Sequence, residues 1–216
     1  MKPTSDVLDK LLRGRHTTMI RVGIGLLVLC GVLGFMGVRE WGLSRSSSAV
    51  PEEITLKALI ARGPRGNPNI VLTEFIPCAN FVYESGKHGE SWTKVWVPAL
   101  PLEQGIAQLK EGPNTVTNFQ AIIISTNAKN EAEMNARLLQ PRLRAMVMNT
   151  LHSLGSEEKK LLAQSYPNTD FSKCLIIEEG REPSGSAMLL LMGGGSVVAC
   201  FAGGVVLVLG IARRKW

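Results

Sequence analysis

Residues 187–212 read AMLLLMGGGSVVACFAGGVVLVLGIA and contain no charged side chain. A helix of this length rises about 39 Å, which exceeds the hydrocarbon thickness of a bilayer, about 30 Å. Arg213, Arg214 and Lys215 follow the run directly, and Trp216 comes next. Basic residues and tryptophan favour the interface between membrane and water. The stretch therefore predicts a membrane-spanning helix over 187–212.

A second uncharged run, VGIGLLVLCGVLGFMGV, covers residues 22–38 and begins directly after Arg21. A helix of this run alone would rise about 25 Å, slightly less than the hydrocarbon core. Adding Met19 and Ile20 gives the required length, with Arg21 reaching toward the headgroups. We expect an uncleaved span over 19–38. A cleaved signal peptide is the alternative, but the run exceeds the usual signal core of roughly 7–15 residues.

Charge predicts the orientation of these spans. The chain has 24 Lys and Arg against 18 Asp and Glu, a net charge of +6. Residues 39–186 hold 16 of each sign, so the whole excess lies at the two ends. The terminal cations include Arg13, Arg15 and Arg21 at one end and Arg213, Arg214 and Lys215 at the other. Because such cations stay in the cytoplasm, both termini should be cytoplasmic and the middle extracytoplasmic. The neutral middle gives no reason to expect a nucleic-acid partner.

The chain is thereby divided into spans, linkers and one domain. We expect a basic cytoplasmic segment (1–18), the first span (19–38), a linker (39–53), the extracytoplasmic domain (54–181), a linker (182–186), the second span (187–212) and a basic cytoplasmic tail (213–216). The linkers contain GLSRSSSAV at 42–50 and EPSGS at 182–186. Such compositions are typical of flexible connections.

The middle of the chain combines strand and helix patterns. Alternating or continuous apolar residues predict strands over 54–61, 70–76, 81–84, 91–97, 119–125 and 174–178. Helical spacing and caps predict helices over 128–139, 141–154 and 157–164, with a short helix inside 102–117. This order indicates an α+β domain. We expect a mainly antiparallel sheet, for which we favour a barrel-like shape, with two or three helices.

The domain contains two cysteines, Cys78 and Cys174. In an extracytoplasmic domain they could form a disulfide, which would stabilise the fold by about 4 kcal/mol on the chain-entropy model. Two separate buried thiols are the alternative. Neither cysteine lies in a C-x-x-C pattern, so zinc binding and thiol redox chemistry are not expected. Cys30 and Cys200 fall within the spans, where we expect them to be small packing residues.

Two groups of side chains are candidates for a ligand or interaction surface. Trp92, Lys94 and Trp96 would share one face of a strand, where stacking could bind a sugar or a base. The alternative is that the tryptophans fill the core. Arg62 and Arg65 accompany a Gly-rich turn, which can bind an anion. No helix follows that turn, so we interpret it as a turn without a ligand.

Small residues recur on both predicted spans. Gly31, Gly34 and Gly37 mark the first, and Gly195, Ala199 and Gly203 mark the second. Such stripes allow helices to approach closely. We expect the two spans to pair with each other, or with those of another copy.

Motifs of catalysis are missing from the sequence. It contains no H-E-x-x-H, G-x-S-x-G, P-loop or dinucleotide fingerprint. We therefore expect no catalytic residue, no cofactor and no metal. An enzyme remains the alternative, in which polar side chains such as Glu74, Glu84, His88 and His152 would have to converge.

The layout of two terminal spans around one external domain is similar to that of the Surfeit-locus assembly factors for cytochrome oxidase. Trp96-Val97-Pro98, after a strand, is the local sequence that resembles them. The layout also resembles that of membrane ubiquitin ligases with a domain between two spans, but the sequence shows no RING after the second span. Neither resemblance assigns the chain to a family.

The function that we favour is interaction or assembly. The chain would be an integral membrane protein whose external domain binds another membrane or extracytoplasmic protein, or another copy of itself, without catalytic chemistry. The alternatives are a membrane-anchored enzyme and a small-ligand-binding or sensory module with Trp92 and Trp96 in a groove.

Overall fold

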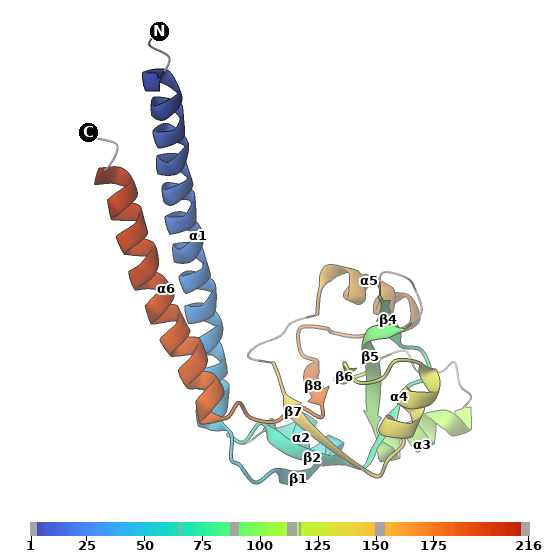
Figure 1. The fold of residues 1–216 in the computed structure, drawn as a ribbon. Coiled ribbons are helices and arrows are strands. Elements are labelled where there is room, and N and C mark those ends of the chain that lie inside the picture. Colours follow the sequence, from blue (N-terminus) through green and yellow to red (C-terminus); the bar gives the residue numbers. More distant parts are fainter. Residues whose placement is uncertain are drawn as a thin grey trace. The chain divides into compact units, whose positions relative to one another are not determined.

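The computed structural model describes residues 4–64, 66–86, 91–111, 116, 118–149 and 154–212, with the side chains of all of these except 4–17, 109, 111 and 186. Its elements are shown in Figure 1. The chain divides into two units, one of residues Met1–Gly42 and Ser184–Trp216, the other of residues Leu43–Pro183. We describe each unit by itself.

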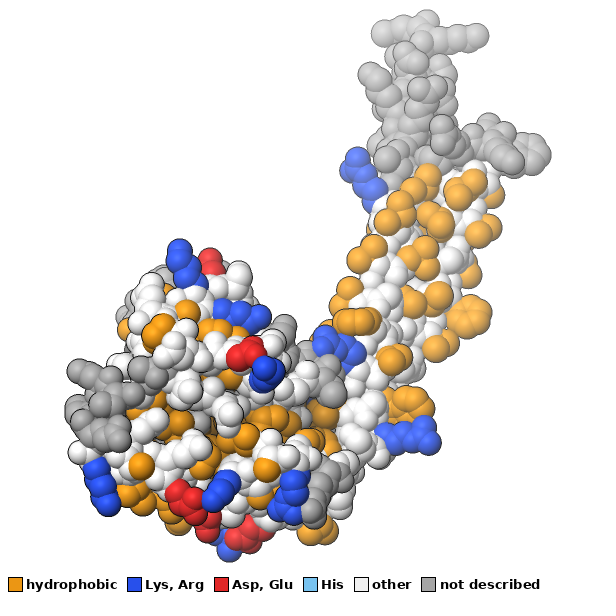
Figure 2. Space-filling view, turned by 180° about the vertical axis from the view of Figure 1, so that it is seen from behind, with side chains coloured by type: hydrophobic (Ala, Val, Ile, Leu, Met, Phe, Trp, Pro, Cys, Tyr) orange, Lys and Arg blue, Asp and Glu red, His pale blue; other side chains and the backbone are white. Residues whose placement is uncertain are grey.

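The first unit contains α6 (Ser186–Ala212) and all of α1 (Thr4–Ser46) up to Gly42. Residues 18–46 of α1 and 187–212 of α6 are long and apolar enough to cross a membrane. Hydrophobic side chains cover the visible face of this helix pair (Figure 2). Helix α1 continues past residue 38 to Ser46, through residues that we expected to begin a linker.

The two helices pack antiparallel through small residues. A Cβ atom on Gly23 would lie 3.1 Å from the carbonyl oxygen of Gly203, and one on Gly210 would lie 3.1 Å from Cγ1 of Ile20. Further along the pair, the Ser196 hydroxyl of α6 donates to the carbonyl oxygen of Cys30 of α1 at 3.1 Å. The absence of side chains at these glycines lets the backbones approach closely.

The residues of the predicted small-residue stripes have different surroundings in the helix pair. Gly34, Gly37 and Gly203 face the partner helix, and Ala199 is buried. Gly31 instead faces open space, and Gly195 only touches Leu33 at 3.9 Å. Gly23, which the sequence analysis did not select, lies in the interface, as does Gly210. Helical spacing predicts which residues share a face, but which face meets the partner is decided by the pairing itself.

The second unit is an α+β domain with eight strands and four helices among the described residues. In chain order these are β1 (Glu52–Thr55), α2 (Leu56–Arg62), β2 (Asn69–Thr73), β3 (Phe75–Pro77), β4 (Val82–Ser85), β5 (Trp92–Pro101), α3 (Leu102–Glu111), β6 (Ala121–Ser125), α4 (Glu131–Leu138), β7 (Arg142–Val147), α5 (Ser156–Ser165) and β8 (Leu175–Glu179). We expected two or three helices.

The strands form one sheet in the order β1-β2-β7-β8-β6-β5-β3, and β4 also pairs with β5. The β1–β2 and β6–β8 pairs are parallel, and the other pairs are antiparallel. The expectation of a mainly antiparallel, barrel-like sheet is confirmed, because the sheet is nearly closed.

Glu74 explains why the sheet curls. β2 lies near one end of the strand order and β3 lies at the other, yet only Glu74 separates them along the chain. Consecutive Cα atoms are about 3.8 Å apart, so the two ends of the sheet must meet at this residue. Glu74 has a φ of 53°, in the left-handed region that few non-glycine residues adopt. Its carbonyl oxygen accepts the backbone N–H of Leu102 at 2.9 Å.

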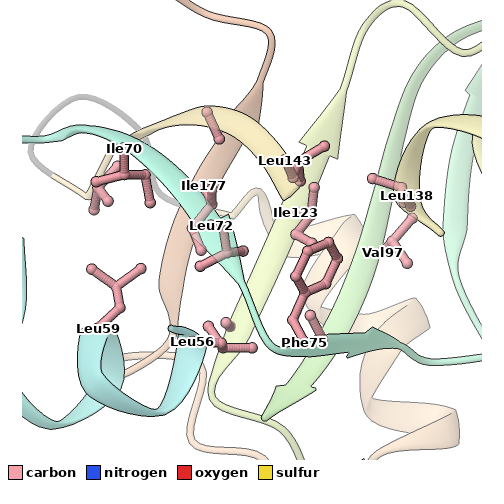
Figure 3. Packing of buried hydrophobic residues seen from close by; sticks show 14 of the residues in the cluster. Leu56, Leu59, Ile70, Leu72, Phe75, Val97, Ile123, Leu138, Leu143 and Ile177 are labelled. Carbon is pink, nitrogen blue, oxygen red and sulfur yellow. The ribbon is translucent and has the colours of Figure 1, made fainter. Parts of the chain in front are cut away.

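One apolar cluster fills the concave side of the sheet. Its strand members alternate along the chain, such as Val95, Val97 and Ala99 of β5, Ala121 and Ile123 of β6, and Leu143, Ala145 and Val147 of β7. In Figure 3, Leu56 and Leu59 of α2 point toward Ile70 and Leu72 of β2. Leu138 of α4 lies beside Val97 in the same view. Helices α2 and α4 thus complete the core that the strands begin.

A second cluster covers the outer face of the central strands. It includes Trp96, Ile122, Ile124, Met146 and Ile176 from the sheet, and Leu162 of α5 with Tyr166 after it. Strand β6 is therefore apolar on both sides, whereas β7 adds only Met146 to the outer cluster. This double burial explains the continuous run AIIIS in β6, as expected for a central strand.

Two predicted elements were wrong. Residues 54–61 were expected to be one strand, but helix α2 begins at Leu56, because the Thr55 side chain caps it by accepting the N–H of Ala58 at 3.2 Å. Residues 141–154 were expected to be helical, but β7 occupies Arg142–Val147. Arg142 and Arg144 are exposed and alternate with the buried Leu143 and Ala145, but this alternation is short. The buried Leu143, Met146 and Val147 lie three and four residues apart, which mimics helical spacing.

Strand β5 also differs from expectation, because it continues through Pro98 to Pro101. Its neighbour on one side is interrupted, since β3 pairs with residues 99–101 and β4 with residues 92–96. Pro98 lies opposite this interruption, where the carbonyl of Pro98 accepts the N–H of Cys78 at 2.8 Å. A proline without an N–H is tolerated there, because that side of the strand lacks a continuous partner.

Replacing Gly203 by leucine should separate α1 from α6. A Cβ atom at Gly203 would lie 3.0 Å from Leu26 Cβ and 3.1 Å from the Gly23 carbonyl oxygen. Cys30 and Cys200 interact across the pair, so their oxidative cross-linking by copper phenanthroline in membranes reports the packing. We expect Gly203→Leu to lower the yield about fivefold or more, from an overpacking penalty of about 1–3 kcal/mol.

Gly204→Leu is the matched control, because nothing lies within 4 Å of a Cβ at that position. Its cross-linking yield should equal that of the unchanged chain. Equal yields from the Gly203 and Gly204 variants would contradict the described pairing.

Candidate functional site

A cavity of about 320 Å³ opens between β3, α3 and α4. Its floor is apolar and is formed by the buried side chains of Cys78, Leu100, Met134 and Leu138. Its rim contains the exposed residues Ala79, Glu131, Asn135 and Leu139. Apolar floors with a few polar groups at the opening are typical of small-molecule sites.

Local sequence explains how the two helices frame this cavity. Asn130 caps α4 by accepting the N–H of Glu133 at 2.9 Å. The helix then presents Glu131 and Asn135, which are four residues apart, on the cavity side. On α3, Gly105 permits close packing against β3, because a Cβ there would lie 2.8 Å from Cδ1 of Ile76.

Exposed apolar side chains lie on the helices that border the cavity. Leu102 and Ile106 of α3 are 37% and 44% exposed, and Leu139, directly after α4, is 68% exposed. Leu102 and Ile106 are four residues apart and so share a face of α3. We call Leu102, Ile106 and Leu139 the α3/α4 face.

A buried carboxylate lies at the ends of the parallel strands β6 and β8. Glu179, only 7% exposed, accepts the Ser125 hydroxyl at 2.6 Å and Nη1 of Arg137 at 3.1 Å. Ser125 Oγ in turn accepts the backbone N–H of Ala128 at 3.3 Å. Each oxygen of Glu179 therefore has a partner, and the network ties α4 and the loop before it to the sheet. Sequence reasoning missed this network, because its members are far apart along the chain.

The two domain cysteines are buried free thiols. Tyr166 interacts with the Cys78 thiol, and its hydroxyl donates to the Asn80 carbonyl at 2.9 Å. The Cys174 thiol donates to the Asp170 carbonyl at 3.5 Å. Burial raises the pKa of both thiols to about 11. In Cys78 a hydrogen bond with Tyr166 lowers the pKa, but the effect of burial is larger. The structure thus has two separate thiols, which was the alternative to a disulfide in the sequence analysis. Because their pKa values are raised, neither thiol is activated as a nucleophile at neutral pH.

Trp92, Lys94 and Trp96 do not share a face, contrary to expectation. A β-bulge shifts the pairing from Glu84 opposite Lys94 to Ser85 opposite Trp92, so Thr93 is an extra residue. Trp92 therefore stacks on Tyr83 at 4.6 Å on the concave side. Trp96 is buried in the outer cluster, with Nζ of Lys94 5.0 Å from its ring. A ligand role for these residues stays a prediction.

The remaining predicted residues are dispersed. Arg62 is exposed in the last turn of α2, and Arg65 lies outside the described residues. His88, His152, Arg213, Arg214 and Lys215 also lie outside them, as do the side chains of Arg13 and Arg15, while Arg21 is exposed. Across the described ranges, no three His, Cys, Asp or Glu side chains are grouped so that they could hold a metal ion.

Removing the buried carboxylate should destabilise the domain. In Glu179→Ala, Ser125 and Arg137 lose their acceptor, and we expect a loss of about 1–3 kcal/mol in the free energy of unfolding. Urea unfolding of the full chain in detergent, followed by tryptophan fluorescence, measures it. The control is Glu53→Ala, which removes an exposed ion pair with Arg142 and should cost less than about 1 kcal/mol. Equal losses in the two variants would refute the role given to Glu179.

Comparisons of the chain with protein-family models, with curated proteins and with solved structures found no match. The two layout resemblances therefore gain no support, and only the sequence and the geometry described above bear on function.

Proposed function

We propose that the chain is an integral membrane protein with two spans, whose α+β domain lies outside the cytoplasm and works by binding another protein. The partner would be a membrane or extracytoplasmic protein or a second copy of the chain. The α3/α4 face is the observation that carries the interaction. Large apolar side chains at the surface favour contact with an apolar partner surface.

The helix pair supports the membrane anchor. Its contacts between helices place glycines such as Gly23 and Gly203 against the backbone or side chains of the other helix, whereas its outer surface exposes large apolar side chains such as Phe35, Leu190 and Phe201. This arrangement suits a lipid environment, since close backbone packing holds the pair together and apolar side chains face the lipid. The six excess positive charges of the chain flank the two spans, which favours cytoplasmic termini.

A cysteine introduced on the domain should be labelled from outside the cell. Ala132 is exposed on α4, so Ala132→Cys gives an accessible thiol, whereas the buried native thiols have raised pKa values and react slowly. We expect a membrane-impermeant maleimide to label this variant in intact cells at neutral pH. The unchanged chain is the control and should give only background. Labelling of the variant only after lysis would contradict the proposed orientation.

Charged substitutions on the α3/α4 face should release the partner. We expect Ile106→Glu and Leu139→Glu to reduce the native mass of the full chain, extracted in a mild detergent from its own membranes. The reason is that a buried unpaired carboxylate in an apolar interface is costly. Leu161→Glu is the control, because Leu161 is 49% exposed on α5 and does not border the cavity. An unchanged native mass in all three variants would argue against this face as the interface.

A further inference from the structure

The cavity between β3, α3 and α4 is enclosed by several parts of the fold. Its lining comes from β3, β5, α3, α4 and the segment between β3 and β4, so five parts of the fold converge on one space. The floor residues Leu100, Met134 and Leu138 are at most 5% exposed. An apolar molecule in a cavity with such walls makes dispersion contacts on several sides. Water gains little there, because the walls offer it few hydrogen-bond partners.

The volume limits what can bind. An engineered apolar cavity of about 150 Å³ holds one benzene molecule. The cavity here, about 320 Å³, is roughly twice as large, which suits a compact molecule of about two fused rings. It is too small for a whole membrane lipid, because one lipid chain alone is about half the thickness of a bilayer core of about 30 Å.

Charge limits the ligand further. Among the described residues that line the cavity, Glu131 is the one charged side chain, and it lies at the rim. Asn135 lies one helical turn later on the same side. The Glu131 carboxylate repels an anionic group on a ligand and attracts a cationic one. The Asn135 amide can form hydrogen bonds with an uncharged polar group.

We propose that this cavity is a binding site for a compact, two-ring-sized apolar molecule with a neutral or cationic polar group. The apolar body occupies the floor of Leu100, Met134 and Leu138. The polar group stays at the rim beside Glu131 and Asn135. This site does not depend on the orientation of the chain in a membrane or on the protein partner proposed above.

The test uses the full chain in lipid nanodiscs and three probes of equal shape. These are 2-naphthylmethanol, 2-naphthylmethylamine and 2-naphthoate, which are neutral, cationic and anionic at pH 7. Equilibrium dialysis measures bound probe, and empty nanodiscs give the amount that partitions into lipid. We expect the alcohol and the amine to bind, and the amine to bind roughly two- to fivefold more tightly than the carboxylate, the range of an exposed charge pair.

Two pairs of variants locate the binding. Ala79→Trp fills the rim and should weaken binding of the alcohol at least about tenfold, whereas Ala132→Trp, on the exposed side of α4 and not lining the cavity, should leave it unchanged. Glu131→Gln should abolish the preference for amine over carboxylate, and Glu157→Gln on α5 should preserve it. Tryptophan fluorescence and circular dichroism establish that each variant is folded.

Three results would overturn the proposal. They are no binding above that of empty nanodiscs up to about 1 mM probe, equal loss of binding in the Ala79 and Ala132 variants, and tighter binding of the carboxylate than of the amine. Because the experiment uses purified chain without a partner, failure here leaves the proposed interaction standing. Failure of the native-mass experiment likewise leaves this site standing.

Discussion

The sheet depends on a covalent constraint, the single residue between β2 and β3. Because Glu74 alone connects β2, next to one end of the strand order, with β3 at the other end, the sheet has to curve until those ends meet. Curvature creates a concave side with little room. Alanines point into it from β5, β6 and β7, at Ala99, Ala121 and Ala145. Larger side chains enter from other strand positions, such as Leu72 and Ile123, and from the helices, such as Leu59 of α2 and Met134 of α4.

The cavity lies where the strand beside β5 is interrupted. β3 and β4 follow one side of β5 but leave a gap opposite Pro98, and residues between them, Cys78 and Ala79, line the cavity. A proline that cannot donate a hydrogen bond and a break in the neighbouring strand therefore occur together. Helices α3 and α4 border the same opening, which is why the exposed apolar side chains and the cavity share one part of the domain.

Much of the fold could be predicted from patterns within short stretches. The long apolar helices, the strand around Ile123 and the helix after Ser156 all appear where periodicity indicated them. Periodicity failed at β7, where the alternation that marks a strand covers only Arg142–Ala145 and the buried Leu143, Met146 and Val147 fall at helical spacing. The face of Trp92 could not be predicted either, because the bulge at Thr93 depends on pairing with β4. The cavity and the Glu179 network were beyond sequence reasoning for a related reason, since their members come from distant segments that only the closed sheet brings together.

The position of β8 has a consequence for biosynthesis. This strand is the last of the domain in the sequence, yet it lies between β7 and β6 in the middle of the sheet. Before Leu175–Glu179 leave the ribosome, the chain can form only two separate half-sheets, β1-β2-β7 and β6-β5-β3 with β4. Pairings between strands far apart in sequence form slowly and late. The domain therefore closes only when α6, a few residues further on, is already being synthesised, and a nascent chain that ends before β8 exposes two apolar edges that call for chaperone protection.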